Sequence, residues 1–269
     1  ERDCSFQRNF QKFIEFSPAP NLKIQTKEML YNYAVTLCKS VGYKGLGTVE
    51  FLVDKNEKIY FMEVNPRVQV EHTITEELTG IDLVRSQINV FCGLSIQDQN
   101  LTEVNIIGNR ASIQARLNME SYDDKIQLVP TTGTIKEYDI ASGPGIRVDG
   151  AGKVGFKNSG LYDSLLAKVI ATSDFGLREA VRKLKFTLRM SNISGIETNK
   201  NLIIEVLNQE NIENGSVNIS SIDMKIESYL QKLRTNSQQI AIEDKTSEVS
   251  SDPQNDSPLS ENVIQSELV

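Results

Sequence analysis

Two short segments with alternating apolar and polar residues constrain the fold of this chain most strongly. Residues 47–53 read GTVEFLV and residues 59–65 read IYFMEVN, and the five polar residues 54–58 join them. Alternation with a period of two and a short polar link predict an antiparallel hairpin. A register that pairs Val53 with Tyr60 places Glu50 directly opposite Glu63.

This pairing of two carboxylates needs a reason, because like charges opposite one another destabilise a sheet. Glu50 and Glu63 both lie among apolar neighbours, where like charges need a cation or a raised pKa. Asn65 lies two residues beyond Glu63 and therefore on the same face. Two carboxylates and an amide oxygen are ligands that suit Mg²⁺. We expect a metal site here, with a solvated, structural strand face as the alternative.

The segment after the second strand carries further polar residues at alternate positions. Arg67, Gln69 and Glu71 point the same way if the chain stays extended, although Pro66 indicates that it leaves the sheet or lies at an edge. A cation, an amide and a carboxylate beside a metal site fit an anion held next to a Mg-nucleotide, with a base beside it. The histidine that follows, His72, is more often structural than a ligand.

Two more cations lie elsewhere in the chain, Lys12 in QRNFQKFIEF and Arg116 in ASIQARL. A half-buried arginine on a strand usually has a carboxylate partner. For each residue taken alone, a surface or structural salt bridge is the simpler interpretation.

The rest of the chain mixes both kinds of periodicity. Helical spacing predicts helices over 27–42, 80–92, 174–190 and 200–208, the first with Thr26 as N-cap and Leu30, Ala34, Leu37 and Val41 on one face. From about residue 109 short strands alternate with glycine-rich turns, one of them Gly143-Pro144-Gly145. We expect an α+β architecture in two lobes with a boundary near 100–108.

Composition excludes several classes of function. The chain has 269 residues, a net charge of −7, one histidine and three widely spaced cysteines, which disfavours zinc and Ser-His-Asp chemistry and is typical of reduced thiols. Residues 235–269 hold seven acidic residues and one lysine, a net of −6, and read as a disordered tail. The remaining body is nearly neutral, which argues against a nucleic-acid partner, and no apolar run is long enough for a membrane helix.

At this point the sequence resembles the biotin carboxylase family of ATP-grasp enzymes. The resemblance covers about residues 1–231, in the segments ERDCSFQRNFQK (1–12), PAPNL (18–22), GTVEFLVD (47–54), FMEVNPRVQVEHTITEELTGIDLV (61–84), SIQARL (112–117), YDSLLAK (162–168) and GIETN (195–199). It implies the C-terminal part of an ATP-grasp domain over 1–108, a biotin carboxylase C-terminal domain of mixed strands and helices over 109–231, and the acidic tail over 232–269.

The resemblance also implies roles for single residues. Glu50 and Glu63 would bind Mg²⁺ or Mn²⁺ at the ATP phosphates, with help from Asn65, while Gln7 and Leu52 would lie against the nucleotide. Bicarbonate would be held by Lys12, Arg67, Gln69 and the backbone of Val70. Glu71 would be the base that deprotonates bicarbonate, and Arg116 would stabilise the biotin enolate. Phe10 and Asn9 depart from the family pattern, which usually has His and Arg there.

The expected function is the ATP- and bicarbonate-dependent carboxylation of biotin, within a carboxylase of the pyruvate or acyl-CoA type. The chain starts with Glu and has neither the glycine-rich ATP lid nor a biotin-accepting segment, so we expect a fragment that is inactive alone. Biotin would arrive on a separate carrier domain or protein, and a carboxyltransferase and a second copy of the chain would be further partners. The cytoplasm is the expected compartment, with the mitochondrial matrix open. The alternative is a non-catalytic remnant that acts as an interaction or regulatory subunit.

Overall fold

The computed structural model describes residues 1–8, 11–102, 106, 108–123, 127–213 and 227–231. The predictions for Asn9, Phe10 and the acidic tail therefore lie outside the described residues. Residues 1–229 form one unit. Within the described ranges, no helix is long and apolar enough to cross a membrane.

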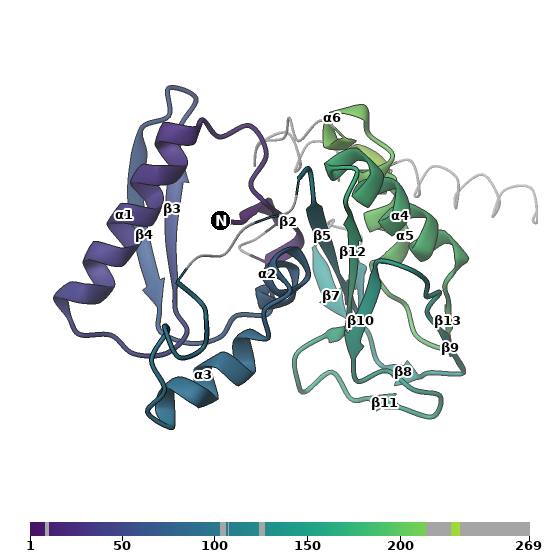
Figure 1. The fold of residues 1–269 in the computed structure, drawn as a ribbon. Helices are drawn as coiled ribbons and strands as arrows, with labels where there is room; N and C mark the ends of the chain where they lie inside the picture. The colour runs from purple at the N-terminus through teal and green to yellow at the C-terminus, as the bar shows by residue number, and fades with distance from the viewer. Residues whose placement is uncertain (9–10, 103–105, 107, 124–126, 214–226, 232–269) are drawn as a thin grey trace, which may run out of the picture. The chain divides into compact units, whose positions relative to one another are not determined.

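A five-stranded antiparallel sheet organises this unit (Figure 1). Its strands run in the order β1-β2-β5-β12-β10 and comprise β1 (Asp3–Arg8), β2 (Gln11–Ser17), β5 (Ala111–Asn118), β12 (Leu165–Ser173) and β10 (Ile146–Gly150). β2 pairs with β5, so a strand from the start of the chain joins strands from beyond residue 110 in one sheet. The sheet thus extends across the predicted boundary near 100–108.

The central strands of this sheet are buried on both faces. Every residue of β5 except Arg116 is buried, and so is every residue of β12 except Leu165. Figure 1 shows α2 (His72–Thr79) on one side of the sheet and α4 (Leu177–Met190) on the other. The apolar stripe of α4 explains its place, since Val181, Leu184 and Leu188 are fully buried.

A second substructure consists of a hairpin and one long helix. β3 (Thr48–Val53) and β4 (Ile59–Asn65) form a two-stranded antiparallel sheet, and α1 (Ile24–Ser40) runs beside it (Figure 1). The Tyr33 and Phe51 rings lie 6.4 Å apart. Lys23, just before α1, forms a 3.5 Å ion pair with Glu57 in the hairpin turn. The start of α1 thus contacts the hairpin turn, and its middle contacts β3.

The remaining elements are short. They comprise α3 (Leu83–Phe91), β6 (Glu120–Tyr122), β7 (Leu128–Pro130), β8 (Gly133–Thr134), β9 (Glu137–Asp139), β11 (Lys157–Asn158), β13 (Asn192–Ser194), α5 (Lys200–Leu207) and α6 (Glu210–Glu213). β6 pairs with β7, β8 with β11, and β9 with β13. Met119, Ile135 and Leu166 form a small core cluster beside these pairs.

Several predicted elements differ from the observed ones. Thr26 is a buried residue inside α1 and not its N-cap, which is Lys23, because its hydroxyl instead contacts Glu57. Of the predicted α1 face only Leu30 is buried, while Leu37 and Val41 are exposed. α2 was not predicted, and the helix expected over 80–92 begins at Leu83. The α+β fold class, α4, α5 and the turn at Pro144 and Gly145 agree with the predictions.

Candidate functional site

The β3–β4 hairpin places the two predicted metal ligands side by side. Glu50 lies directly opposite Glu63, as predicted. The predicted pairing of Val53 with Tyr60 is wrong by one residue, because a bulge between Glu50 and Phe51 shifts the register and Val53 pairs with Ile59. The bulge changes the pairing only toward the turn, so the two glutamates keep their alignment.

Asn65 joins the two carboxylates. Its Nδ2 donates to Glu50 Oε1 at 3.1 Å and to Glu63 Oε1 at 2.8 Å, so these two oxygens are no farther apart than the sum of those distances. An amide N–H bridging two carboxylates relieves part of their repulsion. A divalent cation would relieve more, and Asn65 becomes a ligand when its amide turns to present Oδ1. The three side chains therefore fit a Mg²⁺ site that is completed by phosphate or water oxygens. Within the described ranges, no group of three or more His, Cys, Asp or Glu side chains could hold a metal by itself.

Beyond β4 the chain leaves the sheet and turns, as Pro66 suggested. Gln69 and Glu71 are buried, and Gln69 Nε2 donates to Glu50 Oε1 at 2.8 Å. Arg67 does not point with them as the extended alternation predicted. It is exposed, and its guanidinium donates to the carbonyl of Val68 at 3.1 Å and to Asn65 Oδ1 at 3.4 Å. The turn separates Arg67 from the other two because the strand periodicity ends at Asn65.

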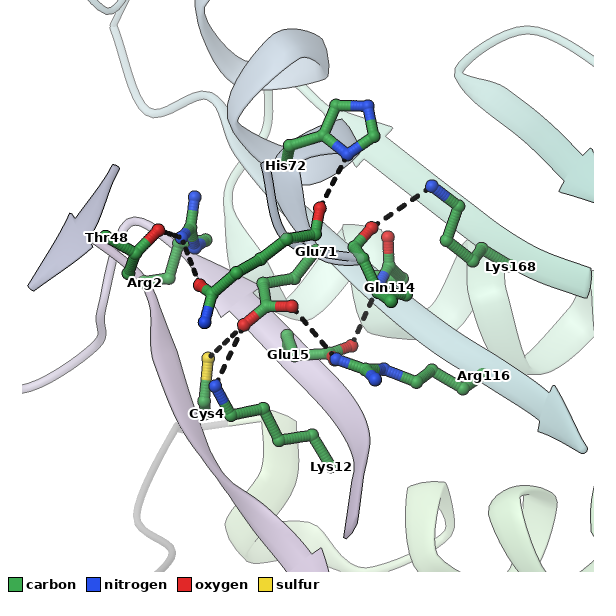
Figure 2. Close-up of polar contacts among 12 residues, drawn as sticks. Arg2, Cys4, Lys12, Glu15, Thr48, Glu71, His72, Gln114, Arg116 and Lys168 are labelled. Carbon is green, nitrogen blue, oxygen red and sulfur yellow. Dashed lines mark hydrogen bonds and ion pairs between the residues drawn. The ribbon is translucent and has the colours of Figure 1, made fainter. Parts of the chain in front are cut away.

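The carboxylate of Glu71 lies between two cations (Figure 2). Lys12 Nζ is 2.9 Å from Glu71 Oε1, and an Arg116 guanidinium nitrogen is 3.0 Å from Glu71 Oε2. Burial raises the pKa of Glu71, but the charge and hydrogen bond of Lys12, a backbone hydrogen bond and the charge of Arg116 outweigh it and leave the pKa below its usual range. Glu71 is therefore ionised at neutral pH. Lys12 Nζ also lies 3.0 Å from Glu50 Oε1, which connects the metal-type pair with Glu71.

A second carboxylate, that of Glu15, holds Arg116 in place. The Glu15 side chain is fully buried. Arg116 Nε donates to Glu15 Oε1 at 2.6 Å, and Gln114 Nε2 donates to Glu15 Oε2 at 3.0 Å. Burial raises the pKa of Glu15 despite the neighbouring Arg116 charge. β2 supplies Lys12 and Glu15 while β5 supplies Gln114 and Arg116, so the pairing of these two strands assembles the base of the site.

The structure brings most of the predicted site residues into one hydrogen-bonded network, and a few predicted residues lie outside it. Lys12, Glu50, Glu63, Asn65, Gln69, Glu71 and Arg116 form one connected network. Gln7 lies on β1 opposite Lys12, and Leu52 is an exposed residue on β3. The Val70 carbonyl accepts from Lys168 Nζ at 3.1 Å.

Several residues that contact the network were not predicted as site residues. They are Arg2, which donates to Gln69 Oε1 at 3.3 Å, and Glu15, Gln114 and Lys168. The sequence indicated a carboxylate partner for Arg116 but gave no signal for Glu15, because their contact depends on the pairing of β2 with β5. Cys4, also unpredicted, donates to Glu71 Oε1 at 3.9 Å. Burial, followed by the Glu15 charge, raises the pKa of this thiol far above its usual range, so it stays neutral.

Comparisons with known proteins identify the family to which the chain is similar. Residues 1–99 match the family described as "Carbamoyl-phosphate synthase L chain, ATP binding domain", and residues 114–224 match "Biotin carboxylase C-terminal domain". The mitochondrial pyruvate carboxylase of Mus musculus is 44% identical over 224 residues, which are 83% of this chain and 19% of that protein.

Solved structures show the same similarity. A single-chain, multi-domain long-chain acyl-CoA carboxylase aligns with a TM-score of 0.79 and 40% identity over 84% of this chain and 24% of its own. The biotin carboxylase domain dimer of Hydrogenobacter thermophilus 2-oxoglutarate carboxylase, in complex with MgADP, ADP and bicarbonate, aligns with a TM-score of 0.74 and 34% identity over 83% of this chain and 48% of its own. This chain therefore spans about a fifth of the mouse pyruvate carboxylase and less than half of each of these two solved chains. By the two matched domains and the aligned structures, the chain belongs to the biotin carboxylase family, of which it carries the C-terminal part of the ATP-binding domain and the C-terminal domain.

Proposed function

We propose that this chain supplies the bicarbonate side of a biotin carboxylase site and the metal ligands for its nucleotide. The observation that carries the proposal is the buried Glu71 carboxylate, held between Lys12 and Arg116 and linked through Glu50 to the Asn65–Glu63 pair. A base, two cations and two metal-type carboxylates within one network match the needs of phosphoryl transfer to a small anion, in which positioning and charge neutralisation dominate.

Glu50, Glu63 and Asn65 would hold Mg²⁺ or Mn²⁺ at the phosphates of ATP. The metal, when bound, neutralises negative charge on the transferred phosphoryl group. Lys12 Nζ now compensates Glu50, and it can turn toward an incoming anion once a metal takes over that charge. Gln7 on β1 and Leu52 on β3 would lie against the nucleotide.

Bicarbonate would bind to Lys12, Arg67, Gln69 and the Val70 N–H. Arg67 has the most freedom of the four, since it is exposed and contacts only Val68 and Asn65 within the described ranges. Glu71 is proposed as the base. Between two cations, the Glu71 carboxylate is fully ionised but weakly basic. A bound bicarbonate that draws Lys12 away would raise the basicity of Glu71.

Arg116 is proposed to stabilise the negative charge that develops on biotin during carboxyl transfer. Glu15 keeps its guanidinium in place on the sheet, so the charge needs little reorganisation. Biotin would be delivered by a carrier domain, and a carboxyltransferase would pass the carboxyl group to pyruvate or an acyl-CoA. The dimer in the name of the Hydrogenobacter thermophilus structure supports a homodimer, and the cytoplasm or the mitochondrial matrix is the proposed compartment.

The test compares two glutamates of the network in the full-length protein. Glu71→Gln keeps the size of the side chain but cannot accept a proton, so bicarbonate-dependent ATP cleavage should fall about 10²- to 10⁴-fold. Its nucleotide affinity should change little. Glu63→Gln, the matched control, should instead weaken Mg-nucleotide binding. Near-normal cleavage in Glu71→Gln, or a loss of nucleotide binding as large as that of Glu63→Gln, would overturn the assignment.

A further inference from the structure

The two peptide groups on either side of Val70 are each held by a side chain that the proposed function does not use. Before Val70, the Gln69 carbonyl accepts from the ring Nδ1 of His72 at 2.7 Å, a contact drawn from the His72 ring in Figure 2. It also accepts from the His72 backbone N–H at 3.1 Å. After Val70, its own carbonyl accepts from Lys168. This arrangement fixes the orientation of the backbone at the centre of the turn.

The contact from His72 sets the direction of the Val70 N–H. A peptide group is planar and trans, so the N–H of Val70 points away from the Gln69 carbonyl to which it is bonded. A carbonyl oxygen can only accept, so Nδ1 of His72 must carry the proton. Within the described ranges the Val70 N–H has no hydrogen-bond partner of its own. The Val70 N–H is therefore a hydrogen-bond donor with a fixed direction that can bind a ligand.

Lys168 holds the other side of the residue. It is 8% exposed on β12, directly opposite Arg116 on β5. Its Nζ lies 3.1 Å from the Val70 carbonyl, 3.3 Å from Thr73 Oγ1 and 3.6 Å from an Asp149 oxygen. A buried ammonium group shared between the Asp149 carboxylate, the Val70 carbonyl and the Thr73 hydroxyl of α2 restrains Val70 and the residue after it, Glu71.

We propose that His72 and Lys168 are positioning residues, which aim the Val70 N–H at bicarbonate and hold Glu71 at its distance from that anion. The inference rests on the proposed function. It gives a role to the only histidine of the sequence: its ring acts on the peptide group before Val70.

The test uses two amide variants of His72 in the full-length protein. In His72→Asn the side-chain NH₂ takes the place of Nδ1, whereas in His72→Gln it lies near the place of Nε2, so only the first keeps the hydrogen bond to Gln69. We expect the KM for bicarbonate to stay within about twofold in His72→Asn and to rise about tenfold or more in His72→Gln. The KM for ATP should be unchanged in both, which also shows that both fold.

Lys168 provides an independent pair. Lys168→Met should raise the KM for bicarbonate and lower kcat, because Glu71 shifts with the turn, and Lys168→Arg should restore part of the loss. If His72→Asn and His72→Gln behave alike, or if Lys168→Met changes the KM for ATP as much as that for bicarbonate, the positioning roles are refuted. A wild-type protein without bicarbonate-dependent ATP cleavage would instead refute the proposed function, and this inference with it.

Discussion

Glu15 shows how strongly this site depends on one residue that touches no proposed substrate. Its carboxylate has no exposed surface and accepts from Arg116 and Gln114. Removing one member of a buried ion pair leaves the other charge without compensation, which usually costs about 3–5 kcal/mol. Because Arg116 keeps a second carboxylate, Glu71, the cost here should lie at the lower end of that range.

We therefore expect Glu15→Ala to lower the free energy of unfolding by about 3 kcal/mol in urea titrations. The matched control is Glu213→Ala, which removes surface ion pairs with Arg178, Arg182 and Lys185 and should cost about 1 kcal/mol or less. Equal losses in the two variants would mean that burial of the Glu15 pair adds nothing to stability.

Single residues differ in how far the sequence alone could place them. Glu50 and Glu63 could be paired from strand periodicity, since only five residues separate the two segments. Glu15 could not be assigned to Arg116, because their contact depends on the pairing of β2 with β5, about a hundred residues apart. Arg67 was misplaced because strand geometry was extended past Pro66, where the backbone turns.

Among the elements, α4 was the most predictable, because the apolar residues that recur at helical spacing in its sequence are the ones that are buried. Leucine, valine and alanine recur at helical spacing on one face, and that face packs against β5 and β12. α2 gave no such signal, since it is eight residues long and two of its four buried positions, Thr73 and Glu76, are polar or charged. β1 and β2 were missed because β2 is buried along most of its length and lacks alternation.

The agreement for α4 leads to a stability prediction. Leu184 is fully buried, so Leu184→Ala should cost about 2–5 kcal/mol through lost transfer energy and the cavity left behind. Phe186 lies on the same helix and is 65% exposed, so Phe186→Ala should change stability by less than about 0.5 kcal/mol. Thermal and urea unfolding of both variants would measure this difference. A larger loss for Phe186→Ala would show that the exposed side of α4 is covered in solution.

At the scale of the whole molecule, the predicted boundary near residues 100–108 falls between the two family matches, which end at 99 and resume at 114. The main sheet nevertheless joins strands from both sides of it. Local sequence patterns could not reveal this, because the strands that meet are far apart in the chain. The site lies where they meet: Lys12 and Glu15 come from one side of the boundary, and Gln114 and Arg116 from the other.

The last prediction concerns what the 269 residues can do alone. The matched part is 48% of a biotin carboxylase domain that binds MgADP and bicarbonate. On the proposed metal-binding hairpin, Leu52, Phe61 and Met62 are about half exposed. Phosphoryl transfer needs the nucleotide to be held from both sides, and a misplaced phosphate loses most of the advantage of proximity. We therefore expect the purified chain to release no phosphate from ATP above the rate of its own Glu71→Gln variant, with or without bicarbonate. The full-length protein should show a bicarbonate-dependent rate in the same assay. A chain that reaches that rate would show that its hairpin and the turn at Glu71 form a complete nucleotide site.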